Sequence, residues 1–159
     1  MLIHYFKKNK NSDKNQANEI YKKILDLSVD FVNSNNFFLK KDFYVSFEVF
    51  SFLLILFIKS NKDLKIKDFK IINQELINIF IKDLDNSFRE QGIGDMSIGK
   101  YVKSHVKKFY FRLKFIEKNI ANTNLNKFSI FVRDLNFIKI NHEMQFSKKI
   151  LDIYTKIQL

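Results

Sequence analysis

Histidine is the side chain that most often binds metals or transfers protons near neutral pH. The chain has three, His4, His105 and His142, and no two of them stand at the spacing of a metal-ligand pair. His142-Glu143 begins like the zinc-binding motif of metalloproteases, but Phe146 occupies the position of the second histidine. We therefore predict no metal site, and we place each histidine at the surface or at the edge of the core.

The segment from Gly94 to Lys100 has the Gly-x-x-x-x-Gly-Lys spacing of a phosphate-binding loop. The next residue is Tyr101, where such loops carry the Ser or Thr that holds magnesium, and a helical pattern precedes the segment instead of a strand. A nucleotide site is therefore not expected. We interpret the start of the segment as part of a tight turn between two helices that begins at Gly92, and the glycines of this turn, Gly92 and Gly94, permit a positive φ.

Four acidic residues lie close together in the sequence: Asp83, Asp85, Glu90 and Asp95. Paired carboxylates can transfer protons or bind a cation, but solvated charges at helix ends are more common, and we favour that interpretation. No Gly-x-Ser-x-Gly motif occurs, and no Ser–His–Asp arrangement follows from the spacing. We predict a protein that is not an enzyme, with no cofactor and no small-molecule substrate.

The strongly basic composition has two explanations, a polyanionic partner or the base composition of the genome. The formal net charge is +11, and there is no cysteine, which excludes disulfides and thiolate metal sites. A basic surface suits RNA or an anionic membrane. The chain is also rich in Lys, Asn, Ile and Phe and has no proline, a pattern typical of an AT-rich genome. Both explanations of the charge stay open.

Apolar residues recur at helical spacing from Ala17 to Asn33. Asp42 is placed to cap a buried helix from Phe43 to Lys59. The most apolar stretch of that helix, Val49 to Ile58, is shorter than the roughly 20 residues that cross a bilayer. We expect a core helix there, with a helix that lies on a membrane as the alternative. Residues 1–16 are predicted to be a flexible basic segment.

Asp68 can cap a third helix, and Ser97 is the predicted N-cap of a fourth that runs from Ile98 to about Asn119. The fourth helix has one apolar side, and a stripe of lysines lies well away from it: Lys100, Lys103, Lys107, Lys114 and Lys118. A short helix and a final amphipathic segment follow, while residues 135–140 fit either helix or strand. The prediction is an all-α, single-domain bundle of about five to six helices over residues 17–159.

The segment from Phe80 to Phe111 reads FIKDLDNSFREQGIGDMSIGKYVKSHVKKFYF. It resembles the motif of the ubiquinol–cytochrome c chaperone family, which combines two acidic positions, Arg-Glu, two glycines, an Asp and then a basic helix. The matching positions here are Asp83, Asp85, Arg89, Glu90, Gly92, Gly94, Asp95, Val102, Lys103, Phe109 and Tyr110. Phe47 and Glu48 resemble the start of the family's long apolar helix, although Val45-Ser46 replaces its usual Gly-Arg and Leu53 replaces a frequent His.

The resemblance implies a non-enzymatic helical chaperone that binds newly made cytochrome b during assembly of the cytochrome bc1 complex. It implies as partners the ribosome and a small helical protein, and the lysine stripe itself suits an anionic membrane surface or ribosomal RNA. The expected location is cytoplasmic, peripheral at the inner face of the cytoplasmic membrane, or the matrix side in an organelle. An RNA- or ribosome-binding module that uses the lysine stripe alone is the alternative function.

Two structural expectations follow for the motif. Arg89 or Glu90 should be tied to the turn, Arg89 most simply by an ion pair with Asp95 that is partly buried between the two helices. The five lysines should form an exposed ridge that serves for docking to a partner or a membrane. Phenylalanine, with 19 residues in the chain, should supply apolar surface beyond what the core needs, as a chaperone for an apolar client requires.

Overall fold

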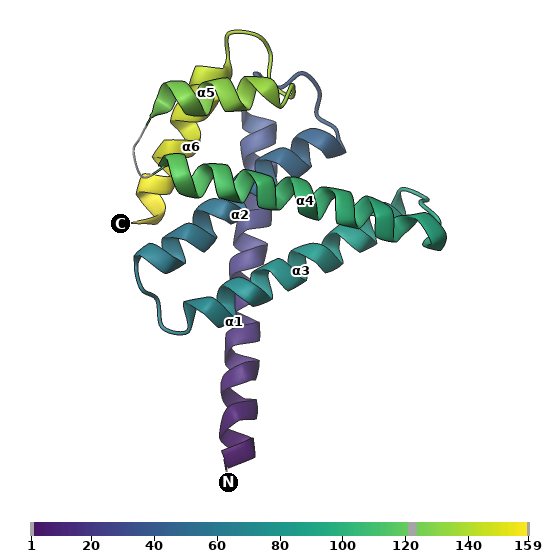
Figure 1. The fold of residues 1–159 in the computed structure, drawn as a ribbon, viewed down its shortest axis with the longest axis vertical. Helices are drawn as coiled ribbons and strands as arrows, with labels where there is room; N and C mark the ends of the chain where they lie inside the picture. The colour runs from purple at the N-terminus through teal and green to yellow at the C-terminus, as the bar shows by residue number, and fades with distance from the viewer. Residues whose placement is uncertain (1, 121–123, 159) are drawn as a thin grey trace.

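A computed structural model describes residues 2–120 and 124–158 of the protein, and these residues form six helices and no strand. The helices are α1 (Leu2–Ser34), α2 (Phe43–Asp63), α3 (Phe69–Glu90), α4 (Asp95–Asn119), α5 (Leu125–Asp134) and α6 (Glu143–Ile157). Figure 1 shows them as one body, with α2 in contact with α1, α3, α4 and α6. The predicted all-α, single-domain bundle is confirmed.

Helix α2 is the central core helix. The Asp42 carboxylate accepts a hydrogen bond from the Val45 amide at 3.1 Å, which is the predicted N-cap. By length and composition α2 could cross a membrane, but 72% of its most apolar window is buried by the rest of the protein. The core-helix prediction is therefore confirmed. The helix extends to Asp63, beyond the predicted end at Lys59.

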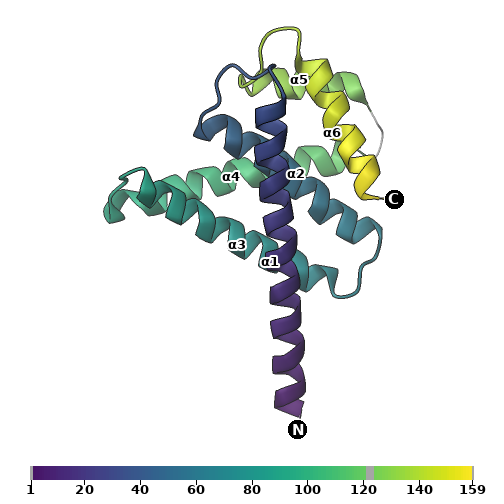
Figure 2. The same cartoon turned by 180° about the vertical axis from the view of Figure 1, so that it is seen from behind.

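Helix α1 is longer than predicted. Its second half packs on α2 and α3 through buried residues that include Ala17, Tyr21, Ile24 and Phe31. Its first half continues as helix from Leu2 and extends beyond the other helices (Figures 1 and 2). The polar sequence of residues 7–16 suggested an irregular segment, but a packed helix propagates more easily than one starts. The flexibility of residues 1–16 stays a prediction.

Helices α3 and α4 meet at the motif turn and spread apart from it (Figure 1). Helix α3 buries the predicted face, namely Ile72, Leu76, Phe80, Leu84 and Phe88. One predicted cap is wrong and another is right in position alone. Helix α4 begins at Asp95, and its N-cap position is Gly94, three residues before the predicted Ser97. Asp68 stands at the N-cap position of α3 as predicted, but it has a left-handed φ of 58° and its side chain forms no cap hydrogen bond.

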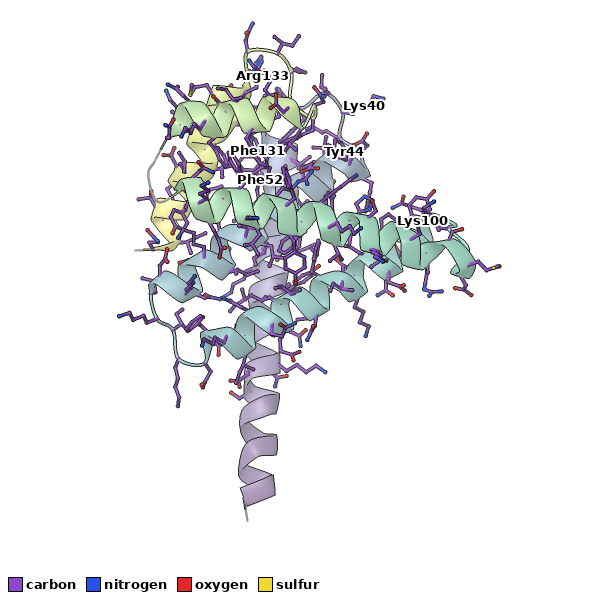
Figure 3. All side chains as sticks on the ribbon, viewed as in Figure 1. Lys40, Tyr44, Phe52, Lys100, Phe131 and Arg133 are labelled. Carbon is purple, nitrogen blue, oxygen red and sulfur yellow. The ribbon has the colours of Figure 1, made fainter. Side chains whose placement is uncertain are left out.

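The C-terminal helices close an aromatic core. Phe52 of α2 contacts Phe131 of α5 at 6.4 Å and Phe146 of α6 at 5.6 Å between ring centroids, and Figure 3 shows Phe52 and Phe131 in the region between α4 and α5. The ambiguous stretch at residues 135–140 is neither helix nor strand: Leu135 and Asn136 form a turn, and Ile138 forms an isolated antiparallel bridge with Phe38. Most described phenylalanines are buried. The core therefore uses the phenylalanine that we had assigned to exposed surface.

Candidate functional site

The motif turn ends α3 with a reversal that needs glycine at one position. Gly92 has a φ of 82°, its amide donates to the Arg89 carbonyl at 2.9 Å, and the Ile93 amide donates to the Phe88 carbonyl at 3.1 Å. These two bonds are those of the Schellman motif. Gly94 has a φ of −70° instead, so the prediction of a positive φ is right for Gly92 and wrong for Gly94.

Arg89 ties the turn together across the protein surface. Its Nε donates to Asp85 Oδ2 at 2.7 Å, and its Nη1 pairs with the Asp95 carboxylate. The predicted pair with Asp95 is present, but it is not buried, because the Asp95 side chain is 83% exposed. Such exposed pairs stabilise little. Glu90 is exposed as well and joins no ion pair within the described part of the chain.

Asp83 points to another helix. The Tyr21 hydroxyl of α1 donates to Asp83 Oδ2 at 2.8 Å. Burial and the neighbouring Asp83 carboxylate hold the pKa of Tyr21 far above its ordinary value, so the phenol stays protonated and the bond persists. Asp83 is thus more than the solvated charge that we expected. Asp83 thus points to α1, whereas Asp85 and Asp95 meet at Arg89. Residues 2–120 and 124–158 contain no cluster of three or more potential metal ligands.

Asp83 also stands at the edge of an apolar groove between α1, α2 and α3. The groove encloses about 190 Å³ and is open to solvent beside Leu25 and Val29, whose side chains are 40% and 52% exposed. An apolar cavity of about 150 Å³ can bind benzene, so this one has room for a large apolar side chain. It is lined by Leu25, Ser28, Val29, Phe43, Ser46, Phe47, Phe50, Phe80, Asp83, Leu84 and Ser87.

His105 lies beside the groove, at the edge of the core as predicted. Its ring is 4.8 Å from both the Phe47 and the Phe88 ring centroids, and Nδ1 lies 2.9 Å from the Tyr101 carbonyl oxygen. Burial lowers the pKa of His105 below its ordinary value. His142 is half-buried at the start of α6. The side chain of His4 lies outside the described residues.

The five lysines of α4 are all exposed, as the spacing predicts: Lys100, Lys103, Lys107, Lys114 and Lys118. We call this set the lysine ridge. None of its members forms an ion pair with any residue that the structure describes. Lys100 projects from the end of α4 near the motif turn (Figure 3). Their clustering is established, while their role in docking stays a prediction.

A buried ion pair between Glu48 of α2 and Arg112 of α4 was not predicted. Arg112 Nε donates to Glu48 Oε2 at 2.5 Å, and Nη2 pairs with the second carboxylate oxygen. The side chain of Glu48 is 0% exposed and that of Arg112 is 4% exposed. Nη1 donates to the Lys108 carbonyl at 2.8 Å. The sequence held a signal for this pair. Glu48 is a lone charge inside an apolar run, and Arg112 is an arginine in a chain that otherwise prefers lysine.

An open apolar groove, an exposed basic ridge and a helical body that holds them define a helical binding protein. A comparison with protein families identifies the class further. Residues 36–136 match the model of the ubiquinol-cytochrome C chaperone family, so the chain belongs to that family and serves as an assembly chaperone of the cytochrome bc1 complex. The match contains α2, α3, α4, α5 and the motif turn, and it confirms the resemblance seen in the sequence.

A solved structure supports the fold over nearly the whole chain. The crystal structure of the Cbp3 homolog from Brucella abortus superposes with a TM-score of 0.78 at 19% sequence identity. The superposition covers 99% of this chain and 88% of that chain, so α1, which lies outside the family match, is part of the shared fold. A comparison with curated proteins finds no match.

Proposed function

We propose that this protein holds newly made cytochrome b during bc1 assembly and does so without catalysing a reaction. The observation that carries the proposal is the open apolar groove between α1, α2 and α3. Cytochrome b is a membrane protein, and its apolar helices need cover until they enter the bilayer or meet their partner subunits. An exposed apolar surface with a polar edge is the feature that such cover requires.

The groove suits a helix of the client. Recognition of a helix in a groove places its apolar side chains at intervals of three or four residues into the site. Leu25 and Val29 are four residues apart on α1 and stand on the open side of the groove, while Phe47 and Phe80 form its buried wall. One large client side chain can enter the cavity while its neighbours contact Leu25 and Val29. Asp83 adds a polar group at the edge.

The test replaces the open side of the groove. Leu25→Ser with Val29→Ser should leave the melting temperature close to that of the wild type, because both side chains are already partly exposed. The matched control is Leu64→Ser with Ile71→Ser, at 49% and 47% exposure outside the groove. Co-purification of cytochrome b from membranes should fall for the groove variant and persist for the control.

A photo-crosslinker at Val29 gives a second reading. During synthesis of cytochrome b in a cell-free system, the crosslinker at Val29 should capture the client, and one at Leu64 should not. Equal capture of cytochrome b at both positions, or normal co-purification by the groove variant, would remove the groove from the proposal. The proposed location is the inner face of the cytoplasmic membrane, or the matrix side in an organelle, where the client is inserted. Fractionation with an antibody tests it.

A further inference from the structure

The outer face of α4 combines cations with exposed apolar side chains. Phe111 is 62% exposed and lies four residues after Lys107 and three before Lys114, so it shares the face of the lysine ridge. Met96 is fully exposed four residues before Lys100. From Met96 to Lys118 this face is about 33 Å long, at about 1.5 Å per residue. Most described phenylalanines are buried, which makes Phe111 an exception in need of an explanation.

We infer that the lysine ridge together with Phe111 is a docking surface for an anionic lipid bilayer. The ridge lysines pair with no acidic group in the described parts of the chain, so their charges are free to meet lipid phosphates. The acidic residues within α4 are Asp95, which pairs with Arg89, and Glu117. Basic residues that flank an apolar ring are typical of helices that lie in the membrane interface.

The shape of this surface favours a bilayer over single-stranded RNA. Proteins that bind single strands use a charged groove with aromatic rings along it. The ridge is instead the outward side of one helix. The nearby cavity that Phe115 and Phe131 line contains one cation, Lys127, beside the acidic Asp134, so it is not a basic groove. A row of cations along the outward side of a straight helix fits a flat anionic surface. The side chains of Phe111 and Met96 can then insert into the bilayer interface.

Docking by the ridge leaves the client groove accessible. Helix α4 lies on the near side of the molecule in Figure 1 and α1 on the far side, and the order is reversed in Figure 2. Leu25 and Val29, the open side of the groove, belong to α1. The protein can therefore be attached to the membrane by one face and hold a client on another. The docking inference stands independently of the client proposed above.

The test is co-sedimentation of the purified full chain with vesicles made of equal parts phosphatidylglycerol and phosphatidylcholine. Each basic residue near an anionic surface strengthens binding roughly fivefold. Lys103→Gln, Lys107→Gln and Lys114→Gln together should weaken partitioning roughly 100-fold by that measure. Phe111→Ala should weaken it roughly tenfold while leaving the charge unchanged. The matched control, Lys14→Gln with Lys22→Gln and Lys23→Gln, removes the same charge from exposed positions of α1 and should retain binding.

Several outcomes would overturn the inference. One is equal binding of the ridge variant and the α1 control, and another is no loss with Phe111→Ala. A third is wild-type binding to ribosomes or single-stranded RNA with none to the anionic vesicles. Wild-type binding should weaken as salt rises from about 0.1 to 1 M, since the screening length falls from about 10 to 3 Å. Co-purification of cytochrome b, measured on the same variants in detergent, should be unchanged, so a failure here is distinct from a failure of the client groove.

Discussion

The buried pair of Glu48 and Arg112 allows a quantitative test of how α2 and α4 are held together. Both carboxylate oxygens of Glu48 meet the guanidinium of Arg112, and almost none of either side chain reaches solvent. The perturbations are Arg112→Met, Glu48→Gln and the apolar double variant Glu48→Leu with Arg112→Met. The single variants leave one buried partner without its counterpart, and the double variant removes both.

The magnitude follows from desolvation. A charge stranded in the core destabilises a protein by about 3–5 kcal/mol, whereas replacing both charges by apolar groups ranges from neutral to about 1–4 kcal/mol stabilising. A domain has about 5–15 kcal/mol of total stability, so Arg112→Met should lower the urea midpoint of unfolding sharply. Glu48→Gln should have a smaller effect, because its amide oxygen can still accept a hydrogen bond from the arginine. The double variant should recover most of the stability.

The assay is urea unfolding followed by the helical circular dichroism signal, with the exposed Arg89 and Asp85 pair as the internal comparison. Replacing Arg89 by Met should leave the midpoint near that of the wild type, since the pair is solvated. If Arg112→Met and Glu48→Gln each lowered stability by less than about 1 kcal/mol, the range of surface pairs, the two residues would not be coupled in a desolvated site. A double variant that is no more stable than Arg112→Met alone would refute the reasoning equally.

Three further predictions concern the groove and the turn. Gly92→Ala should destabilise by about 1–2 kcal/mol because of the positive φ, while thermal melts of Gly94→Ala should stay near wild type, since no heavy atom lies within 4 Å of the added Cβ. Tyr21→Phe should lower stability by about 1 kcal/mol through loss of the bond to Asp83, and urea unfolding would show it. Burial lowers the pKa of His105 in the folded protein, so the unfolded chain binds a proton at a higher pH than the folded protein does. The free energy of unfolding should therefore decline as the pH falls below about 6.5. His105→Gln should flatten that dependence between about pH 7 and pH 5 in pH-dependent melts.

The features that the sequence predicted well are those set by local periodicity. The apolar face of α3 and the lysine ridge of α4 follow from about 100° of rotation per residue, whatever the helices pack against. The Asp42 cap is equally local, since one side chain satisfies an amide three residues away. The motif segment also carried the family resemblance, which a match over residues 36–136 confirms.

The features that the sequence did not predict depend on which helices meet. Glu48 and Arg112 are 64 residues apart, and Tyr21 and Asp83 are 62 apart, so no periodicity joins them. The groove needs three helices to form its walls. The burial of Arg89 also depends on which helices meet, and we overestimated it. The turn stands at the end of the helical hairpin formed by α3 and α4, where nothing in the described structure covers it.

These contacts explain why the family motif combines residue types that form no single chemical site. Asp83 bonds to α1 at the edge of the groove, Gly92 reverses the chain, and Arg89 joins Asp95 at the first residue of α4. The motif thus fixes α3 relative to α1, which forms the open side of the groove, and relative to α4, which carries the ridge. A change in the groove or in the ridge should therefore affect one surface alone. A change such as Gly92→Ala should disturb client capture and vesicle binding together, because the strained turn positions both helices.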